Sequence, residues 1–342
     1  MSASRADDAP NGAADGAAGV QDAQDAKDAV RLGLIFAVAA YAIWGLFPIY
    51  IKQVASVSPL EVVGHRIVWS VPFGAAILAL RKQWPETIAA FRNMRLLRAL
   101  AFSSAVIALN WLFYVWAVAN DRVLEASLGY YINPLMFVAA GVVVIGEQLS
   151  RAQTIAVALA CLGVAALTIG AGVFPWVALI LACSFTTYGF VRKTTNVGAM
   201  PGLFIETVLL APFALATLFW LAQTRGLAFV DEGPGMATLL ALGGPVTVGP
   251  LVLFALAARR LKLSTIGFIQ YIGPTGQFFL GLYYGETFTL AHGICFGLIW
   301  TALLVVSVDA VRKQRGADCA GPPSAAGGFK RRFGLRRPAD RT

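Results

Sequence analysis

The side chains of this chain that could do chemistry are few, and most of them lie inside long apolar stretches. Arg66 lies within residues 59–80, and a charge inside a membrane-spanning helix costs roughly 3 kcal/mol or more. Arg66 must therefore face a partner or a cavity, where it could bind a solute or hold a structural ion pair. Glu206 stands 140 positions later. The expected depths of the two charges do not favour a direct bond between them, so separate roles on opposite sides of a site are as plausible.

Glu61 and His65 form a second candidate pair. They are four residues apart, so a helix places them on one face. Histidine titrates near neutral pH and could relay protons beside a carboxylate. A simple local hydrogen bond is the alternative. Glu61, His65 and Glu206 are the candidate residues for proton coupling.

Two similar segments each place a proline in the middle of an apolar stretch. Residues 124–134 end in Tyr-Ile-Asn-Pro, and residues 263–274 end in Tyr-Ile-Gly-Pro. A proline in a helix removes one hydrogen bond and displaces the carbonyl four residues earlier, here that of Tyr130 or Gln270. Each proline lies about 15 Å from the start of its segment, roughly half-way across a bilayer. We therefore expect both helices to bend at the midplane and to turn the freed carbonyls toward protein or a water-filled cavity.

These two segments predict a solute-binding site near the midplane of the membrane. In a purely structural alternative the prolines bend helices for packing, and the polar side chains tie helices together. We favour a binding site, because paired helix interruptions at corresponding positions of two halves point to transporter sites. The predicted solute-binding residues are Arg66, Asn110, Tyr130, Tyr131, Asn133, Gln270 and Tyr271, and the predicted kink or gating residues are Pro134, Gly273 and Pro274.

The elements that must position these residues are membrane-spanning helices. Of the 342 residues, 58% are hydrophobic and 13% are charged, whereas a soluble domain has about 25% charged residues. The apolar runs are continuous and do not alternate, which argues against a transmembrane barrel. The sequence predicts an all-α polytopic membrane protein with ten spans, at residues 32–51, 59–80, 97–118, 124–145, 153–170, 174–191, 203–222, 236–257, 263–284 and 289–309.

The first five spans are loosely repeated by the last five. An offset of 140 residues aligns the two Tyr-Ile-x-Pro segments, and also Pro72-Phe73 with Pro212-Phe213. Each half holds an odd number of spans, so the halves must lie upside down relative to each other, as in many secondary transporters. The predicted organisation is a disordered tail (1–30), a first five-helix repeat (31–170), a second five-helix repeat (171–312) and a basic tail (313–342).

The formal net charge of +9 is distributed as in a membrane protein. Lys and Arg concentrate in the tails and in alternate loops, such as that between residues 80 and 97, and this positive-inside bias places both termini in the cytoplasm. The charge is therefore not a sign of nucleic-acid binding. The expected partners are the lipid bilayer and a small-molecule solute. The basic tail could contact anionic lipid headgroups or simply be solvated.

Several other classes of protein do not fit the sequence. No GxxxxGK[ST] segment is present, so ATP hydrolysis by this chain is not expected. The chain has two His residues and neither an HExxH motif nor paired cysteines, so we expect no enzyme, no metal and no cofactor. GxxxG spacings such as Gly281 and Gly285 fit close packing within one subunit better than a dimer. The oligomeric state stays open, with a monomer as one option.

Over most of its length the chain resembles a known family. It is similar to the bacterial RarD proteins, a group of EamA-type permeases of the drug/metabolite transporter superfamily. The shared stretches cover nearly all of residues 31–312, and the His65-Arg66 pair and the run from Leu124 to Tyr130 are specific to this group. The matching stretches are Tyr41 to Gly45, His65 to Ser70, Asn110 to Leu112, Leu124 to Pro134, Gly146-Glu147, Ile205 to Thr207, Leu263 to Pro274 and Tyr284 to Glu286.

The resemblance implies a ten-helix permease of the bacterial inner membrane. Members are often labelled chloramphenicol-sensitivity proteins, and relatives in the superfamily export amino acids or other metabolites. The resemblance supplies no firm substrate and no established site residues. Our main hypothesis is alternating-access transport of a small amphipathic metabolite or drug-like solute, directed outward. The alternative is a membrane sensor or assembly factor that keeps the transporter fold.

Overall fold

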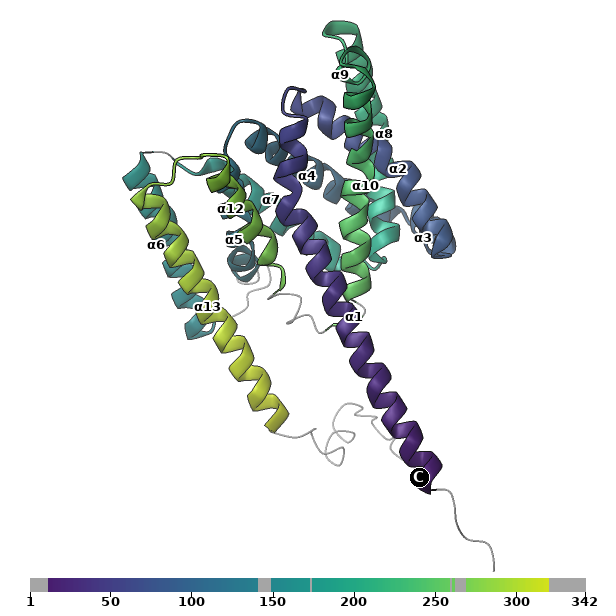
Figure 1. The fold of residues 1–342 in the computed structure, drawn as a ribbon, viewed down its shortest axis with the longest axis vertical. Coiled ribbons are helices and arrows are strands. Elements are labelled where there is room, and N and C mark those ends of the chain that lie inside the picture. The colour runs from purple at the N-terminus through teal and green to yellow at the C-terminus, as the bar shows by residue number, and fades with distance from the viewer. Residues whose placement is uncertain (1–11, 141–148, 173, 259, 262–268, 320–342) are drawn as a thin grey trace, which may run out of the picture.

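The described part of the chain is built from helices alone. The computed structural model describes residues 12–140, 149–172, 174–258, 260–261 and 269–319, and no β-strand occurs in these ranges (Figure 1). In the first half the helices are α1 (Gly12–Gln53), α2 (Pro59–Leu80), α3 (Trp84–Arg92), α4 (Met94–Ala119), α5 (Val123–Ala140) and α6 (Arg151–Ala171). In the second half they are α7 (Trp176–Thr194), α8 (Ala199–Thr224), α9 (Ala228–Asp231), α10 (Gly233–Ala258), α12 (Ile272–Tyr283) and α13 (Leu290–Cys319).

Seven of these helices are long and apolar enough to cross a membrane. Their most apolar windows have a mean hydropathy between 1.4 and 2.1, and they lie in α1, α2, α4, α6, α8, α10 and α13. A shorter apolar segment, Trp176–Arg192, lies in α7. The expectation of an all-helical, multi-pass membrane protein is confirmed. The fourth and ninth predicted spans include residues 141–145 and 263–268, which lie outside the described residues.

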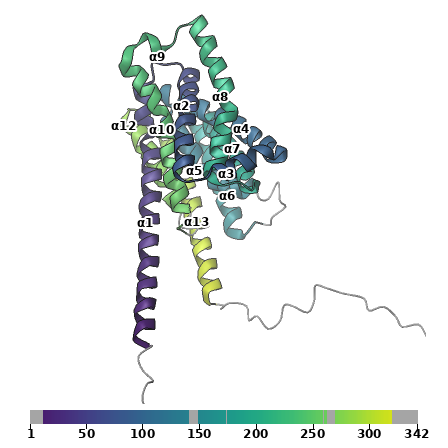
Figure 2. The same ribbon diagram turned by 90° about the vertical axis from the view of Figure 1, so that its right-hand side faces the viewer.

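The two terminal helices extend beyond the spans predicted for them. α1 begins at Gly12, so residues 12–30 are helical, where we expected a tail without regular structure. Their composition is rich in alanine, which has the highest helix propensity. α13 likewise continues to Cys319, past the predicted boundary at residue 312. Both helices project from the same end of the bundle in two perpendicular views (Figures 1 and 2).

The helices pack mainly across the chain midpoint. α1 packs against α10 and α12, α2 against α8 and α10, and α4 against α7 and α8. α5 packs against α7 and α12, and α6 lies along α13 (Figure 1). The core therefore lies largely between residues 31–170 and residues 171–312, and side chains from both can meet there.

Two apolar clusters fill most of this core. One surrounds Phe47, Ile67 and Tyr114, and the other surrounds Leu128 and Phe296. Large apolar side chains also lie on the outside of the helices, as expected for a surface in contact with lipid. Examples are Ile169, Phe213 and Leu304. The polar residues of interest lie beside or between the two clusters.

Candidate functional site

Arg66 is buried at the junction of α2, α1, α4 and α10. Its Nε donates a hydrogen bond to Thr247 Oγ1 of α10 at 3.1 Å. The rings of Phe47 and Trp111 lie 4.8 Å and 5.0 Å from its guanidinium carbon. The guanidinium thus contacts two aromatic rings, one from α1 and one from α4.

The charge of Arg66 is only partly compensated. No carboxylate of the described residues forms an ion pair with Arg66, and within those residues its Nη1 has no hydrogen-bond partner although it is buried. Each desolvated cation–π contact contributes about 2 kcal/mol, whereas burying an unpaired ion costs several kcal/mol. The protein alone leaves a buried positive charge with a spare donor, which is a suitable place for a polar ligand.

Three tyrosines continue from the Phe47 ring that contacts this charge: Tyr50 and Tyr114 pack against Phe47, and Tyr130 packs against Tyr114. The Tyr114 ring stacks on Phe47, and the rings of Tyr114 and Tyr130 lie 5.7 Å apart. The Tyr114 hydroxyl is buried and has no hydrogen-bond partner in the described part of the chain. It is therefore a second spare donor near Arg66.

Asn110 joins this cluster to α7. Tyr130 Oη donates to Asn110 Oδ1 at 3.3 Å. The amide Nδ2 of Asn110 donates to the Leu181 carbonyl at 3.1 Å and to Ser184 Oγ at 2.8 Å. Asn110 thus ties α4 and α5 to α7, so helix pairing accounts for its contacts.

The close approach of α10 to α2 depends on Gly243. A Cβ at Gly243 would lie 2.8 Å from Arg66 Cγ and 2.9 Å from Tyr50 Oη. Tyr50 itself donates to the Leu239 carbonyl at 3.0 Å. Gly243 and Thr247 are one helical turn apart, so the same face of α10 both makes room for Arg66 and binds it.

The neighbouring tyrosine of α5 belongs to a different group. Tyr131 Oη shares a hydrogen bond with Thr275 Oγ1 at 2.6 Å, and its ring stacks on Tyr271 at 6.4 Å. Ser127 of α5 also donates to the Pro274 carbonyl at 2.9 Å. Successive helical residues point about 100° apart, so Tyr130 and Tyr131 face different helices. The predicted solute-binding residues therefore form two groups, on either side of α5.

The two prolines occupy different helical positions. Pro134 lies inside α5, whereas Pro274 lies in the first turn of α12, where a missing N–H is tolerated. We expected the Gln270 carbonyl to be free. It instead accepts a hydrogen bond from the Gly273 N–H at 3.2 Å. Residues 263–268, in the first half of the ninth predicted span, lie outside the described residues.

Asn133 is the remaining predicted polar residue of α5. It is buried, and in the described residues its Oδ1 has no hydrogen-bond partner. It follows Tyr130 by three residues and so lies on a similar face of α5. Asn133 therefore offers a free acceptor on the helix that also carries Tyr130.

Glu61 and His65 lie together, as their spacing predicts. The distance from His65 Nε2 to Glu61 Oε1 is 3.9 Å, which is too long for a hydrogen bond. Glu61 Oε1 instead accepts from the Phe229 backbone N–H at 3.1 Å, and the His65 ring stacks on Phe229 at 4.6 Å. The pair thus contacts the short helix α9.

Glu206 lies in a separate buried cluster. It accepts hydrogen bonds from Ser103 and from Tyr188 Oη, the latter at 3.2 Å. Arg192 Nε lies 3.8 Å from Glu206 Oε1. The cationic neighbour of Glu206 is therefore Arg192 and not Arg66. Sequence reasoning missed Tyr188 and Arg192, although their four-residue spacing on one helix face was a usable signal.

Two further carboxylates connect the ends of helices. Glu286 accepts from the backbone N–H groups of Val123 and Leu124, at 2.5 Å and 2.8 Å, and so caps the start of α5. Glu125 accepts from the Val177 N–H at the start of α7 at 2.8 Å. Glu286 lies in the loop after α12, and burial raises the pKa of its carboxyl despite these hydrogen bonds.

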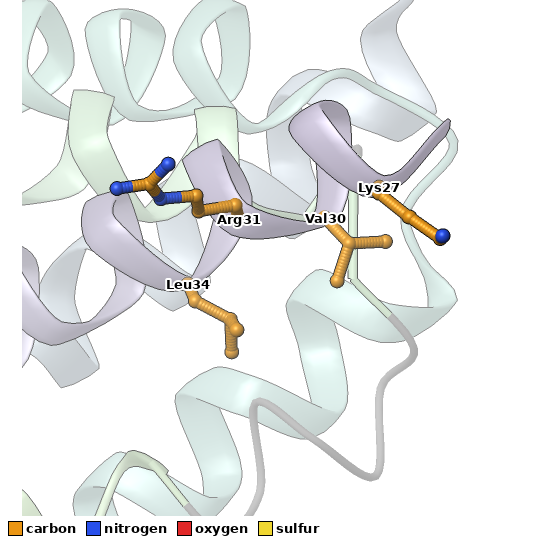
Figure 3. Close-up of a pocket in the computed structure, with 4 residues that line it drawn as sticks. All are labelled: Lys27, Val30, Arg31 and Leu34. Carbon is orange, nitrogen blue, oxygen red and sulfur yellow. The ribbon is translucent and has the colours of Figure 1, made fainter. Parts of the chain in front are cut away.

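Other features of the described residues do not suggest a second site. No group of three or more His, Cys, Asp or Glu residues among them could hold a metal ion. A shallow hollow lies on α1, and Figure 3 shows its four lining side chains on this one helix. All four are exposed, so the hollow is a surface feature: Lys27, Val30, Arg31 and Leu34.

Comparison with known proteins agrees with this architecture. Residues 31–169 match the EamA-like transporter family. Protein RarD of Streptomyces exfoliatus is 44% identical over 83% of this chain and 91% of its own. Protein RarD of Escherichia coli K12 is 41% identical over 83% of this chain and 97% of its own. A solved crystal structure shares the fold at 17% identity, with a TM-score of 0.52 over 81% of this chain and 97% of that one.

The chain belongs to the EamA-like transporter family, and its relatives in that family include proteins named RarD. It is a multi-pass membrane protein of a transporter family.

Proposed function

We propose that this protein is a secondary transporter that moves a small amphipathic metabolite or drug-like solute outward across the bacterial inner membrane. It works by alternating access, with residues 31–170 and 171–312 as two inverted five-helix repeats and both termini in the cytoplasm. The family membership supports the class of protein. The positive charge in alternate loops supports the orientation.

The helix packing supports the two repeats. α2 and α8 begin 140 positions apart, at Pro59 and Ala199, and α4 and α10 begin 139 apart, at Met94 and Gly233. In the proposed repeats α1 corresponds to α7, α4 to α10 and α5 to α12. Exchanging the halves then turns the α1–α10 contact into α7–α4, and the α1–α12 contact into α7–α5. All four of these contacts occur. The pairs α2–α8, α5–α12 and α6–α13 map onto themselves. This pattern is the one expected of two repeats related by a two-fold axis.

The observation that carries the proposal is the cluster around Arg66. A buried cation, with its spare donor, lies among side chains of α1, α2 and α4 from one half and Thr247 of α10 from the other. A site between halves can be closed toward either side of the membrane when the halves rock. Glu61 with His65, and Glu206, are the residues that we propose for coupling to protons.

The test is solute flux in proteoliposomes. Purified protein is given a panel of amino acids and chloramphenicol, with and without a pH gradient. Arg66→Ala and Asn133→Ala are assayed beside Arg95→Ala, which changes an exposed arginine and serves as the control. We expect wild type and Arg95→Ala to move a solute, and the two site variants to move it at least about tenfold more slowly, since each lacks a group that would hydrogen-bond the solute in a desolvated site.

The outcomes separate the elements of the proposal. Normal flux in folded Arg66→Ala and Asn133→Ala protein would leave a transporter without this site. Flux that is indifferent to the pH gradient would remove the coupling role of Glu61, His65 and Glu206. A wild-type protein that binds a solute and moves none would be a sensor with a transporter fold.

A further inference from the structure

We propose that the site around Arg66 selects organic solutes that carry a single carboxylate group attached to an apolar or aromatic body. This inference rests on the proposed transport function and names the class of its substrate. It follows from which donors are free, how many charges are present and what surrounds them.

The free donors define an oxyanion site. Arg66 Nη1 and Tyr114 Oη are both buried, and neither has a partner in the described part of the chain. Phe47 contacts both residues: its ring centroid lies 4.8 Å from the Arg66 guanidinium carbon and 5.7 Å from the Tyr114 ring centroid. A carboxylate accepts hydrogen bonds at two oxygens, so one group can use an arginine N–H and a phenol together.

The number of charges favours a monoanion. Within the described residues, Arg66 is the cation that contacts Phe47 and Trp111. Arg192 also has a buried Nη1 without a hydrogen-bond partner in the described residues, but its charge is balanced by Glu206, whose Oε1 lies 3.8 Å from Arg192 Nε. A carboxylate would balance Arg66, whereas a phosphate monoester would leave about one further charge unbalanced in a desolvated site.

The surroundings favour an apolar body. The Phe47 and Trp111 rings lie within 5.0 Å of the guanidinium carbon, and the unpaired Nη1 is the donor left for an anion. Tyr114 and Tyr130 continue this aromatic surface toward α5. A solute held by its carboxylate at Arg66 would therefore lie against aromatic rings.

The experiment compares matched carboxylates and amides. The probes are 3-phenylpropanoate, indole-3-acetate and octanoate at pH 7, each beside its primary amide, together with phenyl phosphate. Binding is measured as thermal stabilisation of the protein in lipid nanodiscs, and flux is measured in proteoliposomes. Wild type is compared with Arg66→Gln, Arg66→Lys, Tyr114→Phe and the exposed control Arg95→Gln.

We expect at least one carboxylate to bind wild type and Arg95→Gln, and its amide to bind roughly 10- to 100-fold more weakly, as for loss of a charge-assisted hydrogen bond. Arg66→Gln should abolish the preference, and Arg66→Lys should reduce it because the planar fork is lost. Tyr114→Phe removes one hydroxyl from a packed ring. It keeps the test decisive if Arg66→Gln does not fold, and should weaken carboxylate binding roughly 3- to 10-fold.

Three results would overturn the inference. They are no stabilisation of wild type by any carboxylate, equal binding of carboxylate and amide, and tighter binding of phenyl phosphate. Flux of amides or of neutral chloramphenicol without a preference for carboxylates would leave the transporter and remove the anion site. Binding of a carboxylate without flux would leave the site and remove the transport function.

Discussion

Arg66 and Glu206 are both buried charges, but their surroundings give them different properties. Glu206 accepts from Ser103 and Tyr188 and lies beside Arg192, so its charge is compensated within the protein. Arg66 has one hydrogen bond and two aromatic contacts and keeps a spare donor within the described residues. Glu206 therefore contributes to stability beside its proposed role in proton coupling, whereas Arg66 keeps a donor for binding.

Replacing Glu206 by glutamine should destabilise the protein. Glu206→Gln keeps the shape of the side chain but leaves Arg192 without its carboxylate. We expect a loss of about 1–3 kcal/mol, measured as a lower unfolding temperature in nanodiscs. The control is Glu232→Gln, which changes an exposed carboxylate. An unfolding temperature equal to that of Glu232→Gln would show that the cluster adds no stability.

At the scale of elements, α10 determines the position of Arg66. Gly243 and Thr247 of α10 meet Arg66 of α2, one by leaving room and the other by accepting a hydrogen bond. The same helix also packs against α1, which carries Phe47 and Tyr50. The geometry of the site thus depends on how closely α10 approaches its two neighbours.

A methyl group at Gly243 should disturb the site. Gly243→Ala would place Cβ 2.8 Å from Arg66 Cγ, so the arginine must move. We expect flux or binding to fall at least about tenfold, with a stability cost of about 1–3 kcal/mol from overpacking. Gly249→Ala is the matched control in the same helix, because its Cβ would meet nothing within 4 Å. Equal activity of the two variants would contradict this role of Gly243.

The cap of α5 by Glu286 should make stability depend on pH. Burial raises the pKa of Glu286 in the folded state above the ordinary 4.5, so the folded state takes up a proton first as the pH falls. The contribution of Glu286 protonation to the free energy of unfolding is therefore complete below pH 4.5, and it is lost as the pH rises through the folded pKa. The unfolding temperature of wild type relative to Glu286→Gln should therefore rise as the pH falls from 7 toward 4.5. A difference that is constant with pH would exclude this linkage.

For the whole molecule, the proposed mechanism requires the two halves to move relative to each other. At one end of the bundle, Glu286 of the second half binds the start of α5 in the first half. Lys52 and Asp121, in contrast, form an ion pair within the first half. A cross-link at the first contact would restrict motion between the halves, whereas a cross-link at the second would restrict motion only within the first half.

A cross-link between the halves should stop transport. In protein without its four native cysteines, Val123→Cys with Glu286→Cys is joined by a short reducible thiol reagent. We expect flux to be lost and to return on reduction. Lys52→Cys with Asp121→Cys, joined in the same way, should keep its flux because both residues belong to the first half. Continued flux through the Val123–Glu286 cross-link would contradict alternating access at this end.

Part of the site was predictable because it depends on helical spacing alone. The four-residue separation of Glu61 and His65 placed them on one face, and the apolar run around Arg66 marked a charge inside a span. The partners of these residues were not predictable. Phe229 lies 168 positions from Glu61, and Thr247 lies 181 positions from Arg66, and no local pattern connects them.

The sequence by itself determined that the protein is helical and crosses a membrane, and which residues share a helix face, because hydropathy and the helical period are local properties. Only the tertiary structure decided which faces meet. In it, Tyr130 contacts Asn110 whereas Tyr131 contacts Thr275, and Glu206 pairs with Arg192. Lipid tails are as apolar as a helix surface, so hydrophobicity does not choose between neighbours; close packing and interhelical hydrogen bonds do.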